Sequence, residues 1–147
     1  MLITSPSLKN GEYIPKKFTC DGGDINPEFQ VQNVPEDAKS LVLIMDDPDA
    51  PSGTFTHWTV WNINPETIYI KEESKPPGSV EGINSAGQIG YIGPCPPAGN
   101  PHRYFSTLYA LDIRLEVVQG ASREVLEGVL RGHVIEKTEL LGIYGRS

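Results

Sequence analysis

The sequence predicts a mostly β protein, an antiparallel β-sandwich with one short helix in its C-terminal half. The first observation is that the apolar runs are short and separated by turn residues spread fairly evenly from Gly11 to Pro101. The second is the content of 15 Gly and 13 Pro in 147 residues, about ten more than average usage supplies. Many short strands joined by many turns are typical of a sandwich or a barrel.

Each expected strand has its own signature. Residues 29–34 alternate apolar and polar side chains, residues 41–45 are continuously apolar, and residues 58–63 are aromatic and β-branched. The remaining expected strands are residues 67–70, 88–92, 103–118 and 134–144.

One helix is expected between Ser122 and Gly132. Ser122 is a good N-cap residue, apolar residues recur four apart within residues 125–130, and Gly132 can end the helix. The turn signals gather into no linker and no repeat occurs, so residues 1–147 are predicted to form a single domain.

The charge balance excludes some classes of partner. There are 12 Lys plus Arg against 19 Asp plus Glu, which gives a net charge of −7. A nucleic-acid binder needs clustered basic residues, and so does a protein that adsorbs to anionic lipid, so neither is expected. No apolar run approaches the roughly 18 residues of a membrane span, and residues 1–9 do not resemble a signal peptide. A cytoplasmic location is therefore expected.

The chain has two cysteines, Cys20 and Cys95, with no CxxC spacing. Two cysteines are too few for the disulfide framework of a small secreted protein. Both are predicted to be reduced.

Three segments concentrate polar side chains beside rigid turn residues: residues 46–51, residues 57–58 and residues 93–104. Asp47 follows a buried strand, so it is expected at a strand end. Three aspartates within four residues repel one another, and at least one needs a cation, a donor or a proton. A histidine is the natural partner near neutral pH, and His57 and His102 lie in the other two segments.

The same residues can also have purely structural roles. Asp47 and Asp49 can shape an Asx turn before proline. His57 can be a half-buried strand residue satisfied by a backbone group, and His102 is similar. His133, after the helix, is expected at the surface.

Several chemistries fit Asp and His, but each lacks a component. No Gly-x-Ser-x-Gly elbow is present, and Cys95 lies among prolines, which is a poor setting for a nucleophile. His57, His102, Asp47 and Asp49 could hold a metal, but HxH and HExxH spacings are absent, so no metal is predicted.

No phosphate loop or dinucleotide fingerprint occurs either, so no cofactor is predicted. The remaining option is a small preformed anion pocket. The histidines and backbone amides of residues 93–101 would donate to the anion, while Asp47 would orient a histidine or accept from an amine.

Four motifs in this order resemble the phosphatidylethanolamine-binding protein family, and more closely its bacterial and archaeal branch of Raf kinase inhibitor-like proteins. They are DPDAP at 47–51, HW at 57–58, GPCPP at 93–97 and HRY at 102–104. The resemblance implies a β-sandwich with a pocket for phosphate-type head groups at one end. It implies a cis Ala50–Pro51 bond. The predicted ligand-binding residues are Asp47, Pro51, His57, Cys95, Pro96, His102 and Tyr104.

Eukaryotic members of that family usually carry a C-terminal segment that borders the pocket. Here the sequence ends at Gly145-Arg146-Ser147, soon after the last expected strand, so a more open pocket is expected.

The leading hypothesis is a non-enzymatic protein that binds a small phosphorylated or other anionic ligand. A rival hypothesis is an interaction protein that inhibits a protease or kinase through the proline-rich rim. A third is a hydrolase or isomerase that uses His57 and His102 as acid and base. A homodimer formed through exposed strand edges is a further hypothesis.

Overall fold

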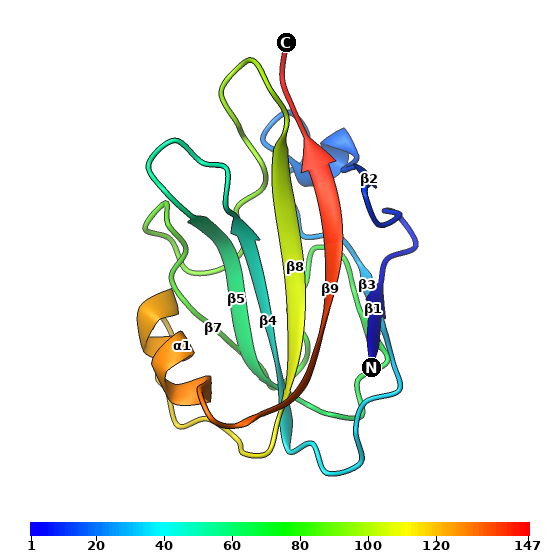
Figure 1. The fold of residues 1–147 in the computed structure, drawn as a ribbon, viewed down its shortest axis with the longest axis vertical. Coiled ribbons are helices and arrows are strands. Elements are labelled where there is room, and N and C mark those ends of the chain that lie inside the picture. Colours follow the sequence, from blue (N-terminus) through cyan, green and yellow to red (C-terminus); the bar gives the residue numbers. More distant parts are fainter.

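Two β-sheets make up most of the structure, a computed structural model that describes residues 1–147 (Figure 1). The larger sheet has the strand order β2 (Glu12–Tyr13), β9 (Val134–Tyr144), β8 (His102–Leu111), β4 (Ser40–Asp47), β5 (Phe55–Ile63) and β7 (Val80–Glu81). The smaller sheet has the order β1 (Leu2–Thr4), β3 (Phe29–Gln32) and β6 (Tyr69–Ile70). A 3₁₀ turn, η1 (Lys16–Phe18), and one helix, α1 (Arg123–Leu130), complete the secondary structure.

The mostly β class with a single helix is confirmed. The pairing differs from the prediction in one place, because β2 runs parallel to β9 while every other pair is antiparallel. Strand β9 has the predicted bounds, and β4 and β5 extend the predicted runs by a few residues.

Three predicted strands are absent or much shorter than expected, and of residues 67–70 only the two of β6 are in a strand. Residues 88–92 form only an isolated bridge, Ile83 to Ile89, because Gly87 and Gly90 on either side adopt positive φ angles of 82° and 109°. The predicted strand 103–118 ends at Leu111. Beyond it the side-chain amide of Asn62 bonds both the N–H and the C=O of Leu115, which replaces the strand ladder.

The helix forms where the sequence places it. The Ser122 hydroxyl accepts from the Val125 amide at 3.2 Å, and Gly132 adopts a positive φ just after the helix. Leu126 and Leu130 are buried, whereas Val125 is half exposed, so only part of the predicted apolar stripe faces the protein.

The core has two parts. The main cluster lies between the sheets, where Phe29 and Val31 of β3 pack with apolar residues of β4, β5 and β8. A second cluster lies on the opposite face of the large sheet, under α1, and includes Trp61, Leu111 and Leu126. Figure 1 shows α1 at the left, beside β5 and β7, and β1 and β3 at the right, beyond β9. No helix has the length and apolarity needed to cross a membrane.

The second cluster predicts a stability difference along one helix. Leu126→Ala removes a fully buried side chain and should lower the free energy of unfolding by about 2–5 kcal/mol. Val125→Ala, at a half-exposed site on the same helix, is the control and should cost less than about 1 kcal/mol. Urea unfolding measures both, and equal losses would contradict this assignment of the buried helix face.

Candidate functional site

A small pocket lies where β4 ends and β8 begins. Its volume is about 150 Å³, smaller than the roughly 300–1,000 Å³ of sites for drug-sized ligands. The pocket is lined by Asp47, Ala50, Pro51, Phe55, His57, Ile92, Gly93, Cys95, Pro96, Pro97, His102 and Tyr104. The structure therefore brings all seven predicted residues into one pocket, and adds Ala50, Phe55, Ile92, Gly93 and Pro97.

Strand alternation sends Asp46 and Asp47 to opposite faces of the large sheet. Asp46 lies on the face that α1 covers, where it accepts hydrogen bonds from the Thr56 hydroxyl at 2.9 Å and from Arg123 at 2.7 Å. Asp47 lies on the other face, is 3 % exposed, and lines the pocket. Only Asp47 is thus placed to act on a ligand there.

The carboxylate of Asp47 has two protein partners. Its Oδ2 accepts from Nδ1 of His102 at 2.7 Å. Its Oδ1 accepts from the backbone N–H of Asp49 at 2.8 Å. This hydrogen bond forms the Asx turn that is the structural role expected for Asp47. Asp47 therefore both shapes the turn and orients the imidazole of His102, and leaves Nε2 as the free ring nitrogen.

Asp49 is neutralised outside the pocket. Its carboxylate accepts from the backbone N–H, Nε and Nη2 of Arg103, each at 2.9 Å. These hydrogen bonds lower the pKa of Asp49 to about 2. The predicted repulsion among three aspartates is thus relieved by three separate partners, since Asp46 pairs with Arg123 and Asp47 with His102.

A β-bulge turns His57 into the pocket. Strand β4 pairs Met45 with Trp58 and Asp46 with Thr56, so His57 is an extra residue with no partner on β4. Without the bulge, alternation would put His57 and Trp58 on opposite faces. Here Trp58 belongs to the main core and His57 lines the pocket on the same side of the sheet. Bulges often re-aim side chains next to functional sites.

His57 is 4 % exposed, and its Nδ1 lies 2.7 Å from the carbonyl oxygen of Ile92. Burial lowers the pKa of His57, although this hydrogen bond and the charge of Asp47 act in the opposite direction. The neutral ring thus donates from Nδ1 to the carbonyl and presents an unprotonated Nε2. Phe55, which the sequence analysis missed, packs against it with ring centroids 4.7 Å apart.

Tyr104 completes the polar lining. Its ring is edge-on to His57 at 5.2 Å and stacked on His102 at 6.5 Å. Burial, followed by the negative charge of Asp47, raises the pKa of Tyr104, so the phenol stays protonated and can donate a hydrogen bond.

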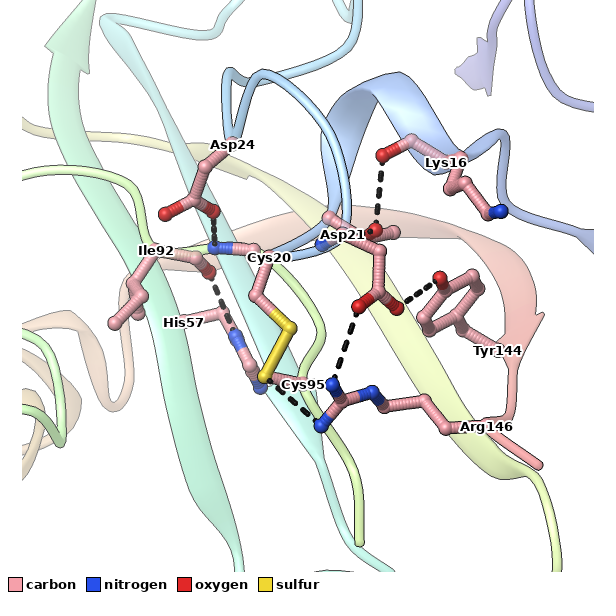
Figure 2. Close-up of a disulfide and its surroundings, with 11 residues drawn as sticks. Lys16, Cys20, Asp21, Asp24, His57, Ile92, Cys95, Tyr144 and Arg146 are labelled. Atoms are coloured by element: carbon pink, nitrogen blue, oxygen red, sulfur yellow. Dashed lines mark hydrogen bonds and ion pairs between the residues drawn. A yellow bond between two sulfur atoms is a disulfide. The ribbon is translucent and has the colours of Figure 1, made fainter. Parts of the chain in front are cut away.

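The prediction of two reduced cysteines is wrong, because Cys20 and Cys95 form a disulfide (Figure 2). They are 75 residues apart in sequence, and only the fold brings the segment after η1 to the pocket wall. The disulfide bears on the expected cytoplasmic location, because stable disulfides are typical of oxidising compartments or of intracellular proteins from hyperthermophiles. That location stays a prediction.

The predicted cis Ala50–Pro51 bond is also wrong, since every peptide bond is trans. A turn reverses the chain there instead, with Gly53 donating its N–H to the carbonyl of Ala50 and adopting a φ of 106°. His133 lies at the surface as predicted, and its Nδ1 is 2.8 Å from a carboxylate oxygen of Asp112.

A metal site and a larger groove are the two alternatives to this pocket. No group of three or more His, Cys, Asp or Glu side chains is placed to hold a metal ion. A larger and more open groove of about 780 Å³ lies beside α1. Its one cationic side chain, Arg123, is already paired with Asp46 and Glu127. The smaller pocket is the better candidate because its lining includes the buried His57 and the partly buried His102.

The disulfide predicts a large stability loss on its removal. Closing a loop of 75 residues stabilises a protein by about 4 kcal/mol in the chain-entropy model. Cys20→Ser with Cys95→Ser should therefore lower the melting temperature by about 10 °C. Calorimetry of the oxidised protein and the double variant measures the difference, and equal melting temperatures would contradict it.

Comparisons with known proteins agree with this architecture. Residues 4–145 match the family model described as phosphatidylethanolamine-binding protein. A UPF0098 protein of Pyrococcus horikoshii is 49% identical over 152 residues, which cover 99% of this chain and 77% of that protein. A UPF0098 protein of Aquifex aeolicus is 48% identical, covering 99% of this chain and 89% of that protein.

Solved structures show the same fold. A homolog of phosphatidylethanolamine-binding protein from Chlamydia trachomatis superposes with a TM-score of 0.94 at 40% identity, over 99% of this chain and 97% of that one. YbcL of E. coli, described as a new member of the mammalian family, gives 0.93 at 31% identity, over 99% and 98%. A carboxypeptidase Y inhibitor solved with its proteinase shares only the fold, with a TM-score of 0.56 at 19% identity over 83% and 71%. The chain therefore belongs to the phosphatidylethanolamine-binding protein family.

Proposed function

We propose that the protein binds a small phosphorylated ligand in the pocket and catalyses no reaction on it. The observation that carries this proposal is the pair of imidazoles, one buried and one partly buried, whose Nδ1 atoms are both held by fixed acceptors. His102 is held by Asp47 and His57 by the carbonyl of Ile92, both at 2.7 Å. Each ring then has one nitrogen, Nε2, left for a ligand.

The size of the pocket supports a head group and not a lipid tail. Its volume of about 150 Å³ equals about five water molecules at roughly 30 Å³ each. A phosphate ester of a short amino alcohol is of that order. The rest of the lining includes the apolar side chains of Phe55, Ile92 and Pro96, which can cover the carbon atoms of such a ligand.

The hydrogen-bond donors available to the ligand differ from the backbone amides of residues 93–101 that the sequence predicted. Between residues 93 and 97 three positions are proline and cannot donate, and Gly93 donates to Asp24 at 2.7 Å. The amide of Cys95 has no hydrogen bond within the protein. The ligand's oxygens would therefore rely on the imidazoles, the Tyr104 hydroxyl and this one amide.

This donor set couples binding to protons. A neutral imidazole that donates from Nδ1 offers only a lone pair at Nε2, which repels an anionic oxygen. A phosphomonoester has a second pKa of about 6, so at pH 7.5 it is mostly a dianion. Binding it would require proton uptake by the site.

The pocket has no side chain suited to nucleophilic catalysis, and acid–base catalysis by His57 and His102 stays a prediction. The lining contains no serine or threonine, and Cys95 in the disulfide is no nucleophile. The rival inhibitor hypothesis has a distant parallel in the fold of the carboxypeptidase Y inhibitor, but no feature of the rim singles out a protein partner. That rival, like the homodimer, stays a prediction.

The first test compares two Asp–His pairs. His102→Gln removes the oriented imidazole and should weaken binding of O-phosphoethanolamine at least tenfold, because a hydrogen bond to a charged group contributes about 1.5–3 kcal/mol. His133→Gln is the matched control, since it breaks a pair of similar geometry at the surface. Titration calorimetry measures both variants. Unchanged affinity in His102→Gln, or no binding by the unmodified protein, would refute the proposal.

The second test is the pH dependence. Protonated His57 binds an anion better than neutral His57, and burial lowers its pKa, so affinity should rise as the pH falls from 8 to 5.5. By linkage, an anion that binds protonated His57 more tightly must raise the pKa of that imidazole. Calorimetry at pH 7.5 in buffers of different ionisation enthalpy should show uptake of about one proton per ligand. Proton release, or affinity that falls on acidification, would contradict this donor assignment.

A further inference from the structure

The disulfide joins the pocket to a distant part of the chain. Cys95 lines the pocket, whereas Cys20 lies outside it, just after η1. Both residues are exposed to solvent. A reagent in solution can therefore reach this bond without unfolding the protein.

The pocket wall around Cys95 has few other attachments. Residues 93–101 form no helix or strand, and four of these nine residues are prolines. Three backbone amide hydrogen bonds hold the segment to its surroundings: Cys20 to the carbonyl of Pro94, Gly93 to the carboxylate of Asp24, and Gly99 to the carbonyl of Arg146. The disulfide is the one covalent cross-link between this segment and the segment that follows η1.

The two sulfur atoms have different electrostatic surroundings (Figure 2). A guanidinium nitrogen of Arg146 lies 3.6 Å from Sγ of Cys95. The same guanidinium pairs with Asp21 at 3.2 Å, and Asp21 follows Cys20 directly in sequence. A neighbouring cation favours the thiolate form of cysteine, and a thiolate that is better stabilised leaves faster in disulfide exchange. Cys95 is therefore the better leaving group.

We propose that the Cys20–Cys95 disulfide is a thiol-exchange site through which a dithiol reductant loosens the pocket wall. A thiolate of the dithiol attacks Sγ of Cys20, the S–S bond breaks, and Cys95 leaves as a thiolate beside Arg146. The second thiol of the reductant then displaces Cys20 from the mixed disulfide. Two electrons and two protons pass to the protein, which ends with two thiols, while the dithiol becomes a disulfide.

The consequence for the ligand rests on the proposed function. Cys95 is itself part of the lining, so the wall in the reduced protein is less ordered before a ligand binds. Ordering it on binding costs free energy, and affinity falls. The oxidised protein would hold the anion and the reduced protein would release it.

The first experiment locates the attack. The folded protein is exposed briefly to reduced glutathione at pH 7, quenched with acid, digested with trypsin and analysed by mass spectrometry. At least a fivefold excess of the mixed disulfide on Cys20 over Cys95 is expected. An even distribution, an excess on Cys95, or no exchange without prior unfolding would overturn the proposal.

The second experiment tests the cation. Arg146→Gln should slow the first exchange step severalfold and remove the preference for Cys20. Arg131→Gln is the matched control, because Arg131 is an exposed arginine after α1 whose one ion pair is with Glu127. Equal exchange rates in the three proteins would show that Arg146 has no role.

The third experiment measures the effect on the pocket. O-phosphoethanolamine is titrated into oxidised protein, reduced protein and Cys20→Ser, with circular dichroism to verify the fold. Reduction should weaken binding at least fivefold. Equal affinity of both redox forms overturns the control of the pocket and leaves the proposed function intact.

Absence of binding by either form contradicts the proposed function instead. In that case, and also if Cys20→Ser does not fold, amide hydrogen exchange of the oxidised and reduced protein decides whether the disulfide controls the pocket wall. Faster exchange at Gly93 and Gly99 on reduction, with the amides of β4 unchanged, supports a wall controlled by the disulfide. Unchanged exchange at both glycines refutes it.

Discussion

The pocket depends on one requirement, that the buried carboxylate of Asp47 has partners. An ionised carboxylate away from water is costly unless it is paired and hydrogen-bonded. Here the imidazole of His102 and the amide of Asp49 meet that need. His102 is the first residue of β8, so the same contact fixes the start of that strand relative to the end of β4. The turn, the strand end and the ring orientation are consequences of satisfying one charge.

The other half of the pocket is built on backbone irregularities. The bulge at His57 interrupts the pairing of β4 and β5, and the loop at Ile92 accepts the hydrogen bond of the re-aimed ring. The Ile92 amide in turn donates to the His57 carbonyl at 3.0 Å. A strand residue and a loop residue thus hold each other without secondary structure in the loop. The disulfide adds a covalent constraint on the same loop, so the rigidity of the site comes from specific contacts and not from a sheet.

Charge pairing also explains why the pocket presents no unpaired carboxylate although the protein has a net charge of −7. Two of the three clustered aspartates are neutralised by arginines outside the pocket. The third is paired with an imidazole inside it. The pocket therefore presents imidazole and phenol groups and not bare carboxylates, which is compatible with an anion that brings or recruits protons.

The sequence by itself determined the features that depend on neighbours along the chain. These include the mostly β class, the helix with its Ser122 cap and the bounds of β9. The grouping of Asp47 with His102, which lies 55 residues further along the chain, followed from the family resemblance. Four features were decided only by the tertiary structure: the bulge, the parallel β2–β9 pair, the Cys20–Cys95 bond and the trans peptide before Pro51. The physical reason is the separation along the chain of the residues that set each feature. Periodicity and capping are local, whereas partners 75 residues apart meet only when the core has packed. Likewise, strand alternation without the bulge would put His57 and Trp58 on opposite faces of the sheet.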